Sequence, residues 1–292
     1  MAEFLISQKI IEGILYGVIQ GITEFLPISS SAHLTVFPWL FNWENISESF
    51  DVALHIGTLL SLIVFFFKEG LELVKTGLAV AFLKIQRLFS KNDKKYKIDA
   101  EKEKSGNLFW FIVIATIPAG IISLVLDKII KHFVGDNKDL TIMLIAVASI
   151  VMGILMYFVD KKMSANKDYD HLTFKDTFLI GISQALAAAC PGVSRSGVTI
   201  TTSRALGYDR KSSAKLSFLL SIPIIMAAVI VSIKDFDLTY PYAFISGILV
   251  SFVIGLVVIK YLFRFLEKSD YKVFATYRFV FGILLIIAMI IK

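Results

Sequence analysis

The chain has 292 residues, of which 56% are hydrophobic and 18% are charged, and its mean hydropathy is +0.73. Several apolar runs are long enough to cross a bilayer, which predicts a polytopic α-helical membrane protein and excludes a soluble enzyme. The net charge is +6, but the basic residues lie in loops between apolar segments, so we expect no nucleic-acid partner. The single cysteine, Cys190, excludes an internal disulfide and a thiolate metal cluster.

Residues 1–49 contain two interrupted apolar stretches, Phe4–Ile22 and Phe25–Phe41, which meet near Glu24. We expect no removable signal peptide, because no basic n-region with a small-residue cleavage site is present. Stretches of this kind are typical of a re-entrant helical pair that enters the membrane and returns to the same face. The segment between Gly17 and His33 carries polar and ionisable side chains, which are costly at membrane depth and indicate a functional site.

Six further segments are long and apolar enough to span a bilayer. Backbone polar groups in lipid must be paired within their own element, so we predict helices. The segments are Phe50–Phe67, Leu108–Leu126, Leu140–Val159, Ala214–Ile233, Pro241–Lys260 and Phe274–Ile291.

The segment from Lys68 to Asn107 holds ten Lys or Arg residues, which predicts a cytoplasmic loop by the positive-inside rule. Its first part, GLELVKTGLAVAFLKIQRLF, has amphipathic helical spacing and is expected to lie along the membrane interface. Its second part, Ser90 to Ser105, is interpreted as a solvated charged loop. With this loop inside, residues 1–49 lie on the extracytoplasmic side.

A second broken apolar stretch runs from Thr177 to Leu206. With a shift of 164 residues it matches the first at four positions, which pair Gly17 with Gly181, Gln20 with Gln184, Pro27 with Pro191 and Ser30 with Ser194. Each half then has a re-entrant pair followed by three spans, and an odd number of spans inverts the second copy. We therefore predict an all-α, single-domain membrane protein with six transmembrane helices and two re-entrant pairs, built from inverted repeats at 1–160 and 161–292.

The second stretch contains PGVSRSG, which has the composition of an anion cradle. Gly192 and Gly197 allow close backbone approach, and the N–H groups of a helix that starts after Pro191 would point at a ligand. Hydroxyl groups and one permanent positive charge suited to phosphate oxygens come from Ser194, Arg195, Ser196 and Thr199.

In the first stretch, Gln20 and Glu24 share a helix face, and Ser30 and His33 share another. An amide and a carboxylate can bind Mg²⁺ or Ca²⁺ when phosphate oxygens and water complete the coordination shell. Ser30 beside His33 fits a nucleophile and its base, and His33 could itself attack phosphorus. The spacing leaves both assignments open.

Other titratable residues are given structural roles. His55, in the first span next to Gly57, is interpreted as a packed or bundle-facing group, and Asp51 as a helix N-terminal carboxylate. His132 and His171 lie in charged loops and are expected to be solvated.

With both stretches in view, the sequence resembles the undecaprenyl-pyrophosphate phosphatase family, the bacitracin-resistance integral membrane proteins. The resemblance extends over essentially the whole chain. In the first family motif, a Glu or Gln is followed by three residues and a Glu, and then by serines and a histidine. This motif is matched by Gln20, Glu24, Ser29, Ser30 and His33. The second, PGxSRSxxT, is matched by Pro191, Gly192, Ser194, Arg195, Ser196 and Thr199. Gln20 replaces a glutamate of other members, which leaves Glu24 as the main carboxylate.

This resemblance implies hydrolysis of the terminal phosphate of a C55 polyprenyl pyrophosphate, which recycles the lipid carrier for peptidoglycan synthesis and confers bacitracin resistance. It also implies a divalent cation, Mg²⁺ or Ca²⁺, and a site that opens to the extracytoplasmic side of the bacterial cell membrane. The lipid tail would leave between spans into the bilayer, and a homodimer is left open.

The resemblance also assigns roles to residues. Ser30 or His33 would be nucleophile or base, and Glu24 with Gln20 would position the metal or a proton. The diphosphate would be bound by Ser29, Ser30, Ser194, Arg195, Ser196 and Thr199, and Arg195 would also be catalytic, because it would stabilise the charge that develops on the transferring phosphoryl group.

A lipid-phosphate transporter or flippase is the alternative, because interrupted helices in inverted repeats are common in secondary transporters. A carrier would also need a basic cradle, but it has less use for a serine and histidine opposite that cradle. Hydrolysis is therefore the favoured prediction, and a purely structural membrane protein gives no reason for an arginine between two serines.

Overall fold

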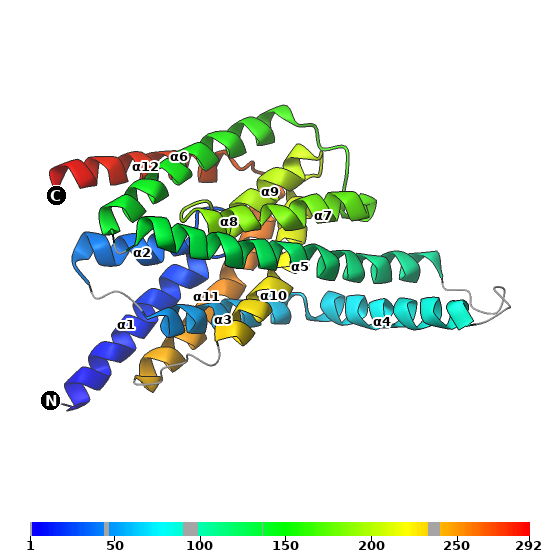
Figure 1. Cartoon of the computed structure of the whole chain (residues 1–292), viewed down its shortest axis with the longest axis horizontal. Coiled ribbons are helices and arrows are strands. Elements are labelled where there is room, and N and C mark those ends of the chain that lie inside the picture. The colour runs from blue at the N-terminus through cyan, green and yellow to red at the C-terminus, as the bar shows by residue number, and fades with distance from the viewer. Residues whose placement is uncertain (1, 44–46, 90–98, 136, 233–239) are drawn as a thin grey trace.

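The computed structural model describes residues 2–43, 47–89, 99–135, 137–232 and 240–292. Within these ranges every regular element is a helix, as predicted from composition (Figure 1). Among the described residues, six helices are long and apolar enough to cross a membrane. They are α3 (Glu48–Phe65), α5 (Ala100–Val134), α6 (Lys138–Lys162), α10 (Arg210–Ser232), α11 (Pro241–Leu266) and α12 (Lys272–Ile291). The six predicted spans are confirmed, and the chain is a multi-pass membrane protein.

The two polar stretches form shorter, interrupted helices. In the first, α1 (Ala2–Thr23) ends before Glu24 and α2 (Ser30–Phe41) begins after the turn. In the second, a 3₁₀ turn, η2 (Tyr169–His171), precedes α7 (Phe174–Ser183), α8 (Ala185–Ala189) and α9 (Arg195–Ala205). The predicted interruptions are present, whereas the re-entrant path and the inversion of the halves stay predictions.

The starts of α2 and α9 are built alike. Ser29 and Ser194 are the N-cap residues, and both have a positive φ, 77° and 70°, which is uncommon outside glycine. Each cap hydroxyl accepts a backbone hydrogen bond, from Ala32 N at 3.3 Å and from Gly197 N at 3.1 Å. The two caps correspond with a shift of 165 residues, one more than the sequence match, so Ser194 is the counterpart of Ser29 and not of Ser30.

Apolar contacts hold the turn between α1 and α2 in the helix bundle. Phe25, which follows Glu24 directly, is buried and meets Phe218 of α10 edge-on with ring centroids 5.4 Å apart. Helix α1 lies against α11, where a Cβ on Gly17 would come 2.9 Å from the carbonyl oxygen of Gly247. Only glycine permits that approach, which fixes the height of α1, and therefore of Glu24, relative to α11.

Helix α4 (Phe67–Phe89) packs against the first part of α5, and Figure 1 shows this pair projecting beyond the other helices. Trp110 Nε1 donates to Gly77 O at 2.9 Å, and Lys84 Nζ donates to Asn107 Oδ1 at 2.9 Å. The predicted charged loop is wrong for residues 100–105, which form the first turns of α5 because AEKEK is a strong helix former and the turns pack against α4. Residues 90–98 lie outside the described part, and the interfacial position of α4 stays a prediction.

A buried ion cluster lies away from the predicted site. Asp160 of α6 accepts from Arg204 Nε at 2.7 Å and from Arg210 Nε at 3.0 Å, and its second oxygen accepts from Tyr271 N at 3.1 Å. The cluster joins α6 to the end of α9, the start of α10 and the start of α12. Arg204 is buried in this network, so it is a structural residue.

Candidate active site

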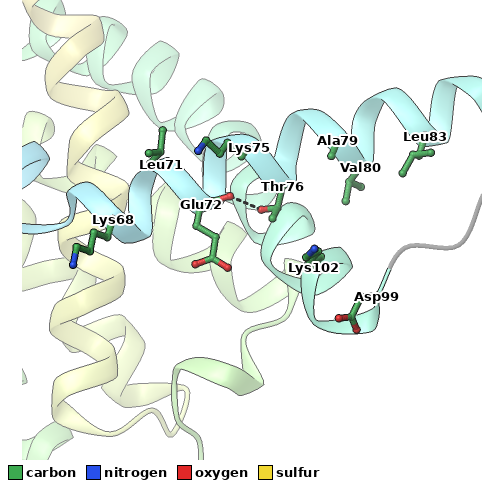
Figure 2. A pocket seen from close by; sticks show the side chains of 10 residues that line it. All are labelled: Lys68, Leu71, Glu72, Lys75, Thr76, Ala79, Val80, Leu83, Asp99 and Lys102. Atoms are coloured by element: carbon green, nitrogen blue, oxygen red, sulfur yellow. Dashed lines mark hydrogen bonds between the residues drawn. The ribbon is translucent and has the colours of Figure 1, made fainter.

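The turns before α2 and α9 meet at a cavity of about 230 Å³. Its lining includes the groups that the sequence singled out on both stretches, among them Glu24, Ser29, Ser30, Ser194, Arg195 and Ser196. A larger cavity, of about 620 Å³, lies between α4 and the start of α5 (Figure 2). It contains none of the predicted site residues, so the smaller cavity is the candidate active site.

Direct hydrogen bonds join the two turns. Arg195 Nη2 donates to Glu24 Oε1 in a salt bridge, and Ser196 Oγ lies 3.3 Å from the carbonyl oxygen of Glu24 and 3.2 Å from that of Leu26. The residues are about 170 positions apart in the chain. The structure therefore brings the two predicted stretches together in one site.

Glu24 is the centre of this network, with a side chain only 4% exposed. Its Oε2 accepts from Ser30 Oγ at 2.6 Å and from Gln20 Nε2 at 3.2 Å, while Oε1 faces Arg195. A buried carboxylate needs such partners, because leaving it unpaired costs several kcal/mol (~3 to 5). The Ser30 hydroxyl is therefore held directly against a carboxylate.

Two helices begin at the cavity, since α2 starts at Ser30 and α9 at Arg195. Their N-termini carry unpaired N–H groups and the positive ends of their dipoles, which favour an anion. The Nε of Arg195 is also buried without an acceptor among the described residues. A guanidinium that lines the cavity beside two helix N-termini is suited to bind phosphate oxygens.

His33 has a different orientation from the one its sequence position suggests. Its Nδ1 lies 2.7 Å from Ser29 O and its Nε2 lies 2.6 Å from the Tyr277 hydroxyl, and the ring stacks on Phe281. Because a carbonyl only accepts, Nδ1 carries the hydrogen, and in the neutral ring Nε2 then accepts from Tyr277. His33 is buried against α12 and does not line the cavity, and its ring nitrogens face Ser29 O and the Tyr277 hydroxyl.

Thr199 also lies behind the cavity. Its hydroxyl is 2.9 Å from Arg195 O and 2.7 Å from Ser217 Oγ of α10, and the side chain is fully buried. It supports the first turn of α9 and is not part of the cavity lining.

Comparison with known proteins identifies the family. The chain matches the family model described as bacitracin resistance protein BacA over residues 13–284. It belongs to this family. Similar BacA relatives are each named undecaprenyl-diphosphatase. One from Pelotomaculum thermopropionicum is 38% identical over 281 residues, which cover 95% of this chain and 96% of the relative. One from Caldicellulosiruptor bescii is 39% identical over 272 residues, covering 92% and 93%.

In this BacA-family site, two residues that the sequence interpretation did not assign make direct contacts. Arg278 of α12 is buried and donates to carbonyl oxygens of both turns, from Nη1 to Pro27 O at 3.1 Å and from Nη2 to Gly192 O at 2.6 Å and Val193 O at 3.1 Å. Its charge inside an apolar span was the available signal. The other is His55 of α3, which lines the cavity; of the two interpretations given to it, packed or bundle-facing, the second agrees with this position.

The fit of a divalent cation can be tested on the oxygens present. The side chain of Gln20 has a buried Oε1 without a partner, whereas both oxygens of Glu24 already face donors. Over the described residues there is no group of three or more His, Cys, Asp or Glu side chains that could hold a metal. Gln20 is fully buried and is not part of the cavity lining, so these two side chains suit a cation only when phosphate oxygens and water supply most of its ligands.

Proposed function

We propose that this BacA-family protein hydrolyses undecaprenyl diphosphate to undecaprenyl phosphate and inorganic phosphate. The observation that carries the proposal is the buried junction of Arg195, Glu24 and Ser30 at two helix N-termini inside a multi-pass membrane protein. The names of the relatives, undecaprenyl-diphosphatase, support it.

In this proposal the anion is bound first. Arg195 lines the cavity with its permanent charge, and the N-terminal N–H groups of α2 and α9 supply further donors for the diphosphate. These groups are fixed before the substrate arrives, so they stabilise the charge on the transferring phosphoryl group without reorganisation. The serines that line the cavity contribute neutral donors.

The hydrogen bond from Ser30 to Glu24 favours Ser30 as the nucleophile and Glu24 as its base. Ser30 Oγ would bond to the terminal phosphorus while its proton passes to Glu24, and the bond to the bridging oxygen would break, releasing undecaprenyl phosphate. Water would then hydrolyse the phosphoserine and regenerate Ser30. His33 would act through the Ser29 carbonyl that it holds, as a positioning residue.

A divalent cation stays part of the proposal. Gln20 and Glu24 would hold it together with substrate oxygens, and it would neutralise charge on the diphosphate. Its chemistry is electrostatic, and the proton transfer described above belongs to Ser30 and Glu24.

The substrate tail and the orientation of the site are also part of the proposal. Ser123 of α5 and Ile224 of α10 line the cavity, so the tail would leave between these helices into the bilayer. The ten basic residues between Lys68 and Asn107 favour an extracytoplasmic site in the bacterial membrane, and the matching caps of α2 and α9 support the inverted repeat. All of these side chains come from one chain.

Phosphate release from undecaprenyl diphosphate by the purified protein in detergent tests the proposal. Arg195→Met is expected to lower kcat/KM by at least about 100-fold, since it removes a charge-assisted anion contact inside a low-dielectric site. The exposed Arg264→Met is the matched control and should leave the rate unchanged. An inactive wild-type protein that moves the lipid across vesicles would instead support the transporter.

A further inference from the structure

His55 lies in contact with the centre of the site although it belongs to neither signature stretch. Its Nε2 is 3.5 Å from Glu24 Oε2, the same oxygen that accepts from Ser30. Its Nδ1 is 2.9 Å from the backbone oxygen of Asp51, one turn earlier on α3, and 3.6 Å from Asp51 Oδ1. The ring therefore connects α3 to the carboxylate that bonds to the proposed nucleophile.

The hydrogen-bond partners define what the ring offers. A backbone carbonyl can only accept, so Nδ1 carries a hydrogen toward Asp51 O. The other ring nitrogen, Nε2, is the one that faces Glu24, and the Oε2 atom it faces is an acceptor. The useful group at this position is thus an N–H donor held at the height of Nε2.

Packing of α3 is provided by other residues. The carbonyl oxygen of Leu54 accepts from Ser251 Oγ of α11 at 3.0 Å. Ser61 Oγ of α3 donates to the carbonyl oxygen of Phe252, also on α11, at 2.8 Å. The side chain of His55 instead lines the cavity and is 26% exposed. A residue that only packed α3 against its neighbour would not have this position.

We propose that His55 is a positioning residue for Glu24. Its Nε2 contacts the Oε2 side of the carboxylate from α3, while Arg195 holds Oε1, so that Oε2 stays directed at the Ser30 hydroxyl. Without His55 the carboxylate can rotate about its last torsion, which is broad and weakly restrained, and can lose alignment with Ser30. This inference rests on the proposed hydrolysis and names one more residue that the reaction uses.

Two amide substitutions separate the roles of the ring nitrogens. Glutamine places an N–H₂ group near the height of Nε2 and can reach Glu24, whereas asparagine reaches only the height of Nδ1 and the Asp51 carbonyl. Both are polar and similar in size, so they separate positioning from general damage to the fold. Alanine removes both contacts.

The experiment measures kcat and KM for undecaprenyl diphosphate with His55→Gln, His55→Asn and His55→Ala. We expect His55→Gln to retain kcat within about fivefold, and the other two to lose at least about tenfold in kcat with KM within about twofold, because alignment acts on the chemical step. The exposed His132→Gln is the matched control. Equal kcat for His55→Asn and wild type, or equal loss for His55→Gln and His55→Ala, would overturn the proposal.

A double variant shows whether His55 acts through Glu24. In the Glu24→Gln background, His55→Ala is expected to cost less than about twofold, because the carboxylate it positions is already absent. A full additional tenfold loss would contradict the inference. An inactive wild-type protein would refute the proposed hydrolysis itself, whereas an active wild type with a fully active His55→Asn would refute only the role of His55.

Discussion

Arg278 gives the sharpest structural prediction, because one buried side chain holds both turns of the site. Its guanidinium donates to the carbonyl oxygens of Pro27, Gly192 and Val193. Arg278→Met keeps much of the volume but removes three charge-assisted hydrogen bonds. Each is worth about 1.5 to 3 kcal/mol, and the losses are not fully additive, so we expect about 3 to 6 kcal/mol of lost stability.

The same change should impair catalysis more than binding. With the carbonyls released, the turn before α9 can shift relative to the turn before α2, and a displacement of about 1 Å from productive geometry costs roughly 100-fold in rate. Arg278→Lys is the companion variant, since one ammonium can reach a carbonyl but cannot bridge both turns as the planar fork does. The unfolding midpoint and kcat of Arg278→Lys should lie between those of Arg278→Met and wild type.

The assay combines thermal unfolding in detergent with steady-state phosphate release. We expect the Met variant to show a lower unfolding midpoint and a lower kcat, with a smaller change in KM. Wild-type values for both the midpoint and kcat in Arg278→Met would show that the turns do not depend on this side chain, and would refute the reasoning.

Three further predictions concern other contacts. Tyr277→Phe removes the donor to His33 Nε2 and should cost about 1 kcal/mol of stability in thermal unfolding, with less change in kcat than His33→Ala causes. Gln20→Glu adds a second carboxylate beside Glu24, so phosphate release after chelation should be restored by less Mg²⁺ than wild type needs; an unchanged requirement would argue against Gln20 as a ligand. Burial raises the pKa of Asp176, but hydrogen bonds from Tyr208, Lys167 and Thr173 outweigh it and lower the pKa overall. The stabilisation is therefore present above the ordinary pKa of about 4 and is lost as pH falls through the lowered value, so Tyr208→Phe should lower the unfolding midpoint at pH 7 and flatten its decline in acid.

The sequence predicts the spans and the site stretches for physical reasons. Apolar runs that must pair their own backbone groups have one solution in lipid, so the six spans follow from composition. Glu24, Ser30 and Arg195 could be found because polar side chains at membrane depth are costly. Their convergence follows from an internal match between two broken stretches, and the salt bridge between Glu24 and Arg195 agrees with it.

Contacts made by side chains on the spans were harder to predict. Arg278 is a charge within an apolar run, but nothing local indicates that carbonyls from two turns surround it. His55 lies on α3, and the rotation of that helix decides whether His55 faces lipid, core or cavity. Hydrogen bonds between α3 and α11, which involve Ser251 and Ser61, set this rotation. A spacing of three placed Ser30 and His33 on one face, yet Ser30 is an end residue of α2 and bonds backward to Glu24.

One measurement tests the central claim most directly. Single-turnover phosphate release from undecaprenyl diphosphate should be followed with wild type and Ser30→Ala, together with a search for phosphoserine on the quenched wild-type enzyme. We expect release by the wild type, at least about a 100-fold slower reaction with Ser30→Ala, and covalent phosphate on Ser30 alone. A Ser30→Ala enzyme with the wild-type rate would contradict the assignment of Ser30 and Glu24 as nucleophile and base.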